Sequence, residues 1–201
     1  VYGLVAIAIS LITLAIMLFT IFRDGTSAFH QATLTLPIEL SAKTLDPKGN
    51  RNRDEMSKVT TVGYQKVLAA ALVAELAKRD ITQDGVSDKD IAGLISKDAA
   101  GQLRADILAN PVLVGTTVTQ DILAAGRVDG FLKGRVTLET AERDNQITPD
   151  QLRLVEKLQA AGIVNSSWNW GFFTNADASD QRPEAAGLGV ALIGSAYMML
   201  M

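Results

Sequence analysis

The chain has 201 residues, 48% of them hydrophobic, a formal net charge of −3 and no cysteine. The near balance of charge argues against a nucleic-acid-binding surface, and the lack of cysteine excludes disulfides, thiolate metal sites and a cysteine nucleophile. All 19 Lys and Arg and all 22 Asp and Glu lie in residues 23–184. The chain therefore divides into a charged middle and two uncharged ends, residues 1–22 and 185–201.

Residues 1–22 are predicted to form a first transmembrane helix. They are apolar on all sides, and their only polar side chains carry hydroxyls. A helix of 22 residues spans roughly 33 Å, which exceeds the hydrocarbon core of about 30 Å. Two alternatives stay open. A cleaved signal peptide would have a shorter apolar core and a small-residue cleavage site, and an apolar helix is also found inside soluble cores.

The charged middle is expected to fold as one α+β domain between the two apolar ends. Alternating Leu34, Leu36 and Ile38 predict a half-buried strand over residues 32–40. Pro37 lacks an N–H, which favours an edge position for this strand. Residues 45–55 are predicted to form a polar loop. Residues 56–79 are predicted to form a helix with one apolar face, made of Val67, Leu68, Ala71, Leu72 and Leu76.

Capping signals predict three further helices in the charged middle. Ser87 with Asp90 is typical of a helix start, and Asn110-Pro111 of the end of a second helix. Thr148-Pro149-Asp150-Gln151 predicts the start of the third, which Gly162 closes. Alternating apolar residues predict two more strands, at residues 112–118 and 131–138.

Chemically reactive residues are sparse, so we expect neither an enzyme nor a bound cofactor or metal. His30 is the only histidine and lacks a Cys or His partner near it in the sequence. Asp46, Asp54 and Glu55 share one loop, but their spacing differs from that of a calcium loop. Three basic residues are candidates for an anion but fit solvated surface equally well: Arg127, Lys133 and Arg135.

Four of the 11 aromatic residues lie within six positions, at Trp168, Trp170, Phe172 and Phe173. Tryptophan favours the membrane–water interface because its ring is apolar and its N–H stays hydrated. The segment is therefore predicted to lie at the membrane interface. The alternative is that these rings cap the domain core, with alternate residues on a strand.

Residues 185–201 are predicted to be the start of a second transmembrane helix, which we expect to continue beyond Met201. Small residues recur four positions apart at Gly187, Ala191 and Ser195. Such a face lets another helix approach closely, so these three residues are predicted to pack against one. The alternative is that small residues are simply common in membrane helices.

Four stretches, in matching order, resemble the N-terminal extension of PstA-type phosphate ABC transporter permeases. They are residues 45–49 (LDPKG); residues 107–111 (ILANP) with 115–118 (GTTV); residues 131–134 (FLKG); and residues 169–175 (NWGFFTN) with 182–184 (RPE) and 187–189 (GLG). The resemblance covers nearly the whole chain.

The resemblance implies that this chain is the first helix, the periplasmic domain and the start of the second helix of a permease in the bacterial inner membrane. It implies a second permease subunit, cytoplasmic ATPase subunits and a periplasmic phosphate-binding protein as partners, with phosphate as the transported substrate and no nucleic acid. Docking of the phosphate-binding protein on the domain is a hypothesis. The alternative from another class is the extracytoplasmic sensor domain of a membrane receptor or histidine kinase, which has the same architecture.

Overall fold

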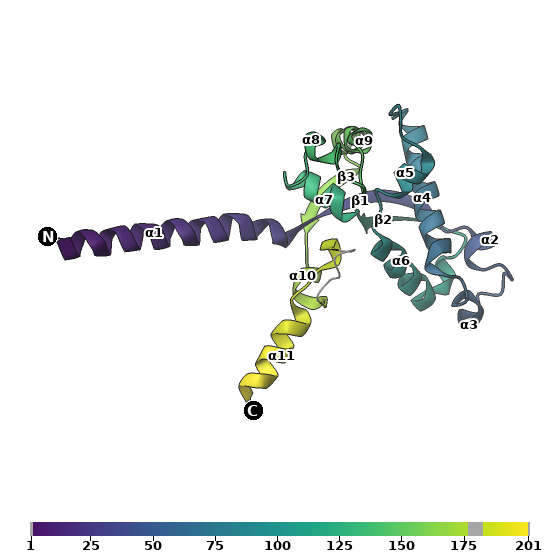
Figure 1. Ribbon diagram of the computed structural model, residues 1–201. Coiled ribbons are helices and arrows are strands. Elements are labelled where there is room, and N and C mark those ends of the chain that lie inside the picture. Colours follow the sequence, from purple (N-terminus) through teal and green to yellow (C-terminus); the bar gives the residue numbers. More distant parts are fainter. Residues whose placement is uncertain (1, 177–182, 201) are drawn as a thin grey trace.

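A computed structural model describes residues 2–176 and 183–200. It has an α+β body from which two apolar helices project (Figure 1), so the predicted fold class is confirmed. The strands are β1 (His30–Glu39), β2 (Thr117–Leu123) and β3 (Val164–Trp168). The α-helices are α1 (Tyr2–Gly25), α2 (Ala42–Leu45), α3 (Arg53–Met56), α4 (Thr61–Lys78), α5 (Asp88–Ala92), α6 (Lys97–Ala109), α7 (Gly126–Leu132), α8 (Leu138–Ala141), α9 (Pro149–Ala160), α10 (Gly171–Thr174) and α11 (Gly189–Leu200). The short 3₁₀ helices are η1 (Thr26–Phe29), η2 (Pro111–Leu113) and η3 (Pro183–Ala185).

The three strands form one antiparallel sheet in the order β2-β1-β3. The predicted strand at residues 32–40 is confirmed as β1, but it is the central strand and not an edge. Pro37 is tolerated because β3 pairs only as far as Leu34, and the last bond on that side is from Thr35 N–H to the Ile163 carbonyl. Backbone N–H groups alternate in direction along a strand, so the missing N–H of Pro37 falls where β3 has already ended.

One face of the sheet carries the core. Leu34, Leu36 and Ile38 are fully buried, as the alternation predicts. Helices α4 and α7 pack on β1, α6 on β2 and α9 on β3. The predicted apolar face of α4 is confirmed, because its members are buried in the same core: Val67, Leu68, Ala71, Leu72 and Leu76.

The helix predicted over residues 56–79 is broken in the structure. It consists of α3 and α4, which are separated by a turn at residues 57–60, so α4 begins only at Thr61. Part of the predicted loop at residues 45–55 is also helical. The Asn52 side chain accepts hydrogen bonds from the N–H groups of Asp54 and Glu55, which starts α3 inside that loop.

Two predicted strands are wrong. Residues 112–118 begin in η2 and turn at Gly115, whose φ is +90°, so β2 starts only at Thr117. Residues 131–138 contain the end of α7 and a turn at Gly134, whose φ is +69°. There the N–H groups of Arg135 and Val136 bond back to the Gly130 carbonyl, which is a helix ending and not a strand pairing.

The predicted helix caps are confirmed. Ser87 and Asp90 form a reciprocal capping box at α5, and Thr148 and Gln151 form another at α9. Gly162 follows α9 with a φ of +71°, the left-handed conformation that ends many helices.

The N-terminal helix α1 has the length and composition of a membrane span, which a signal sequence also has. None of its apolar stretch is buried, so α1 is not a core helix of this body. The hydroxyls of Ser10, Thr13 and Thr20 donate to the carbonyls four residues earlier, which satisfies them within the helix. The shorter α11 is also apolar, and its 12 residues cover about 18 Å. The predicted division of the chain into a first transmembrane helix (residues 1–22), a periplasmic domain (residues 23–184) and the start of a second transmembrane helix (residues 185–201) stays a prediction.

Candidate functional site at the base of the apolar helices

Five aromatic rings meet where the two apolar helices leave the body. We call them the aromatic cluster: Phe29, Trp168, Trp170, Phe172 and Phe173. Phe29 is at its centre. Its ring stacks on Trp168 with centroids 5.6 Å apart and on Phe173 at 5.8 Å, and it meets Phe172 edge-on at 5.3 Å. Such stacked and edge-on pairs are the favoured arrangements of aromatic rings.

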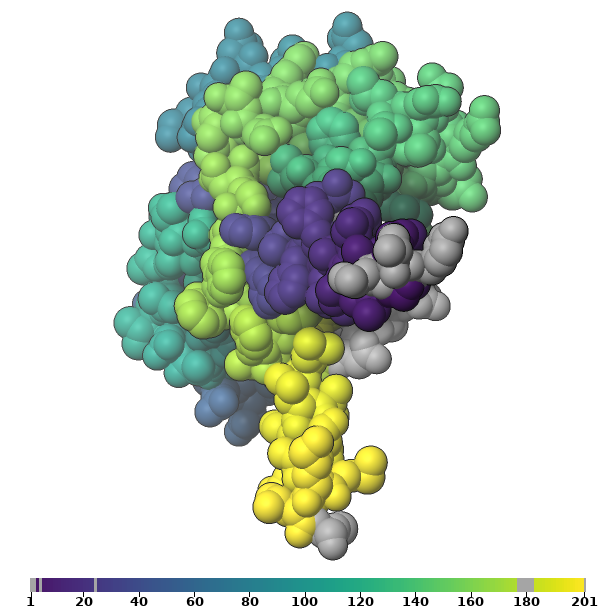
Figure 2. Space-filling model, turned by 90° about the vertical axis from the view of Figure 1, so that its left-hand side faces the viewer, coloured from purple at the N-terminus to yellow at the C-terminus, as the bar shows by residue number. Residues whose placement is uncertain are grey.

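The cluster joins the two ends of the body. Phe29 is the last residue of η1, directly after α1, and Trp168 is the last residue of β3. His30 and Trp168 are direct partners across the sheet, so the first and last strand residues of the body lie side by side. Figure 2 shows residues 160–175, in yellow-green, passing the base of the purple α1.

The predicted strand alternation of Trp168, Trp170 and Phe172 is wrong beyond Trp168. β3 ends there, Trp170 precedes α10, and Phe172 and Phe173 lie on α10. The rings form the outer end of the body, and several remain open. Trp170 is 73% exposed, Trp168 46% and Phe173 42%.

Close backbone contacts connect α10 to the start of α11. The N–H of Leu188 donates to the Phe172 carbonyl at 2.7 Å, and the N–H of Gly189 donates to the Asn175 carbonyl at 2.9 Å. Gly187 and Gly189 are required here. A Cβ at Gly187 would lie 2.6 Å from the Asn175 carbonyl oxygen, and one at Gly189 2.6 Å from that of Thr174. We call this contact the α10–α11 junction.

Gly187, predicted to pack against another helix, thus precedes α11 and lies against the backbone of α10. Ala191 and Ser195 lie on the exposed α11 itself. Their packing against a further helix stays a prediction.

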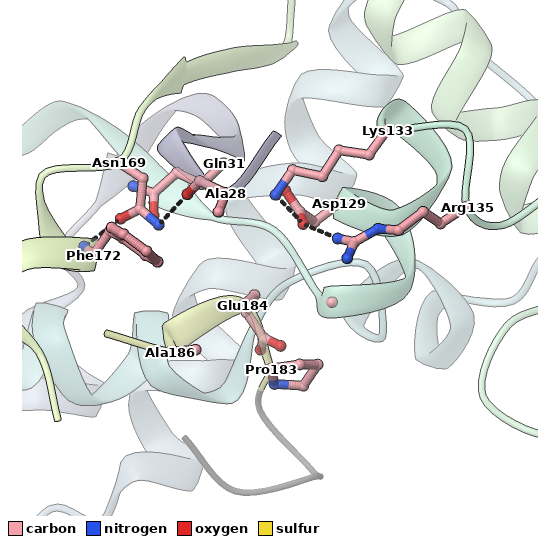
Figure 3. Close-up of a pocket in the computed structure, with 11 residues that line it drawn as sticks. Ala28, Gln31, Asp129, Lys133, Arg135, Asn169, Phe172, Pro183, Glu184 and Ala186 are labelled. Atoms are coloured by element: carbon pink, nitrogen blue, oxygen red, sulfur yellow. Dashed lines mark hydrogen bonds and ion pairs between the residues drawn. The ribbon is translucent and has the colours of Figure 1, made fainter. Parts of the chain in front are cut away.

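A cavity of about 220 Å³ opens beside the aromatic cluster (Figure 3). Its floor is Asp129, which is 5% exposed and whose carboxylate accepts the Ala32 N–H at 2.9 Å. Lys133 and Arg135 both point at the same carboxylate, with ion-pair distances of 2.7 and 3.4 Å. Asp129 therefore accepts a backbone hydrogen bond near the start of the central strand and forms ion pairs with two cationic side chains.

Glu184 lies on the opposite side of the cavity, on the segment that leads to α11. Its carboxylate accepts the Ser96 hydroxyl at 2.5 Å, and Ser96 also caps α6. A Cβ at Gly126 would lie 2.6 Å from Glu184 Oε2, so a glycine there admits the carboxylate. Through this hydrogen bond, Glu184 connects the segment that precedes α11 to the start of α6.

The charges around this cavity cancel. Lys133 and Arg135 face Asp129, and Glu184 adds a second carboxylate to the lining. A site that recognises phosphate instead directs an excess of cationic or N–H donors at the anion. Arg127, the third basic candidate, pairs with Asp144 at 3.1 Å. The three basic candidates are therefore held in ion pairs.

The other candidate residues make contacts with separate partners. His30 is exposed, and its ring meets Trp168 edge-on. Asp46 is buried and accepts the Arg51 N–H at 2.8 Å. Hydrogen bonds from Lys48 and then Asn50 hold the pKa of Glu55 below its ordinary value. Within residues 2–176 and 183–200, no group of three His, Asp or Glu side chains is arranged to hold a metal ion.

Sequence reasoning missed Phe29, Asp129 and Glu184. Phe29 had one usable signal, since it is an aromatic residue soon after an apolar segment. Asp129 had only the four-residue spacing to Lys133 as a signal, because its backbone partner Ala32 is 97 residues away in the chain. Glu184 contacts Ser96 across 88 residues and was equally hidden.

Comparison with known proteins gives one family. A family model described as "Domain of unknown function (DUF3333)" matches residues 1–142. Neither a curated protein nor a solved structure matches the chain. The matched residues include α1, β1, β2 and α7, while β3 and the α10–α11 junction lie after them. The match covers well over half of the chain, which therefore belongs to the DUF3333 family.

Proposed function

We propose that this chain is the N-terminal part of a permease subunit of an ABC-type phosphate importer. In this proposal α1 is the first membrane helix, the body lies in the periplasm and α11 begins the second membrane helix. The partners would be a second permease subunit, cytoplasmic ATPase subunits and a periplasmic phosphate-binding protein.

The observation that carries the proposal is that the body begins and ends at one place. His30 and Trp168 are paired across the sheet, and α1 and α11 leave the same end of the body, although in different directions (Figure 1). A domain with adjacent ends can be inserted between two consecutive membrane helices without separating them. This geometry fits an insertion after the first helix of a polytopic membrane protein.

The residues that carry the family resemblance also have a structural explanation. Gly49, Gly115 and Gly134 have positive φ angles of 67°, 90° and 69°, respectively, which favour glycine strongly. Residues 169–175 and 187–189 meet at the α10–α11 junction. The resembling stretches thus mark turns and one helix junction of this fold, which supports reading the resemblance as structural.

The neutral cavity favours a transporter component over a phosphate sensor. A sensor binds its ligand within its own extracytoplasmic domain, whereas a permease receives phosphate from a separate binding protein. Lys133 and Arg135 are balanced by the carboxylates of Asp129 and Glu184, so the cavity offers phosphate no net positive charge.

The test is phosphate uptake by bacteria in which the gene for this protein is deleted. We expect uptake of radiolabelled phosphate to fall, to recover on expression of the wild-type gene, and sulfate uptake to stay unchanged as the control. Unchanged phosphate uptake under phosphate limitation would contradict the proposal.

A second arm of the same experiment tests docking of the binding protein. Paired antiparallel residues lie about 5 Å apart, so a short Gly-Ser linker between His30 and Trp168 can replace the intervening body. We expect this variant to insert in the membrane but to lose affinity for the phosphate-binding protein. Wild-type affinity and uptake in this variant would exclude a docking role.

A further inference from the structure

The aromatic cluster leaves large apolar rings open although the body has a well-packed core. Phe29 and Phe172 are half-buried in the cluster, while Trp168, Trp170 and Phe173 face outward. All five side chains are uncharged, and they lie together at the end of the body from which the apolar helices leave. An exposed apolar patch of this kind needs an occupant.

The distance from α1 restricts what that occupant can be. Phe29 is the fourth residue of η1, which begins directly after α1 ends at Gly25. Four residues of 3₁₀ helix advance about 8 Å. The headgroup region of one leaflet is roughly 5–8 Å thick, since a bilayer of about 40–45 Å holds a core of about 30 Å. If α1 spans the bilayer, the cluster lies at its surface.

The chemistry of the rings fits that location. Trp168 and Trp170 each join a large apolar surface to one N–H donor, a combination that favours the zone of lipid carbonyls and headgroups. Phe29 fixes the outer rings to the first strand of the body through its stacked contacts. A rigid cluster of this kind sets the orientation of the whole body on the bilayer, and not only its attachment.

We propose that the aromatic cluster is inserted in the headgroup–hydrocarbon boundary of the same bilayer that α1 crosses. The body then rests on the membrane through this end, with α2 and α3 at the end of the body away from α1 (Figure 1). The proposal depends on membrane anchoring by α1 and not on phosphate transport.

The two tryptophans of the chain, both in the cluster, serve as the probes. The full chain is placed in nanodiscs that hold one copy each, made with phosphatidylcholine brominated near the glycerol end of its acyl chains. Trp168→Phe leaves Trp170 as the only emitter, and Trp170→Phe leaves Trp168. The phenylalanine keeps an aromatic ring in the cluster in either case.

A matched control moves the probe to another part of the body. In the double variant lacking both tryptophans, Val62→Trp adds one at an exposed site on α4, at the end of that helix next to α3. We expect brominated lipid to quench Trp170 at least twofold and the Val62→Trp probe hardly at all. Acrylamide in the water should quench in the opposite order.

Equal acrylamide quenching of Trp170 and the Val62→Trp probe, with no effect of brominated lipid, would overturn the proposal. Shielding of Trp170 from both quenchers would overturn it too, because a protein surface and not lipid would then cover the cluster. Neither result depends on phosphate uptake, so failure here is distinguishable from failure of the transport proposal.

Discussion

At the residue scale, Asp129 ties together three parts of the body. Its carboxylate accepts the Ala32 N–H at the end of the central strand and pairs with Lys133 and Arg135. Lys133 is itself only 14% exposed, so removing the carboxylate leaves a shielded cation and a buried N–H without their partner. A single acidic side chain therefore stabilises the end of the body nearest the apolar helices.

We expect Asp129→Ala to lower the free energy of unfolding by about 3 kcal/mol. Asp129→Asn keeps an acceptor for Ala32 but loses both ion pairs, so its loss should be smaller. Asp106, exposed on α6, provides the matched control, and Asp106→Ala should change stability by less than about 0.5 kcal/mol. Denaturant unfolding followed by circular dichroism in mild detergent measures all three. Equal stability of Asp129→Ala and Asp106→Ala would contradict this role.

Residues differ in how well their roles follow from sequence. The capping pairs Ser87 with Asp90 and Thr148 with Gln151 were predictable because both partners lie within one helical turn. Phe29 and Glu184 were not, because their contacts join segments far apart in the chain, and neither was the bond from Asp129 to Ala32. The exposed aromatics were found as a group, but only the fold shows that Phe29 is at their centre.

At the scale of elements, the α10–α11 junction determines how the second apolar helix leaves the body. Phe172 and Asn175 supply carbonyls to the N–H groups of Leu188 and Gly189. The contact is backbone to backbone, so it requires glycine at 187 and 189 and leaves little freedom for adjustment. The close contact with α10 is therefore sufficient to explain why residue 187 is a glycine, without packing against a further helix.

Gly187→Ala should disrupt this junction, because a Cβ there would lie within 2.7 Å of the Asn175 and Gly171 carbonyl oxygens and of the Asn175 Cβ, none of which can move away independently of the backbone. We expect a destabilisation of about 1–3 kcal/mol, typical of overpacking. Gly194→Ala is the matched control, since a Cβ there meets nothing within 4 Å. Thermal unfolding followed by tryptophan emission reports on the junction directly, because Trp168 and Trp170 lie beside it. Identical transitions for the two variants would show that the junction tolerates a side chain.

Elements with strong local signals were predicted, and elements without them were not. The alternation in β1 and the apolar face of α4 gave the central strand and the main core helix. The strands predicted at residues 112–118 and 131–138 failed because alternation in a short apolar run does not distinguish a strand from turns and helix ends. Gly115 and Gly134, with positive φ, are the residues that break them.

At the scale of the whole molecule, the body is a sheet whose first and third strands meet at the base of the apolar helices. The family match ends at residue 142, but β3 pairs with β1 only after residue 163. The fold therefore closes through residues beyond the matched range. The uncharged ends of the sequence predicted the apolar helices. The pairing of His30 with Trp168 follows only from the order of the strands in the sheet, which the alternation of apolar residues does not encode.

In the proposed permease, α1 stays in the membrane and holds the body outside the cytoplasm. Because the chain has no cysteine, single-cysteine variants give labelling without background. Lys48→Cys is on the exposed polar loop of the body, and Leu14→Cys is in the middle of α1. The measurement is labelling by a membrane-impermeant maleimide in intact spheroplasts. We expect Lys48→Cys to be labelled in intact spheroplasts and Leu14→Cys only after detergent is added. Labelling of Leu14→Cys at the same rate as Lys48→Cys, or protection of Lys48→Cys until the inner membrane is broken, would contradict it.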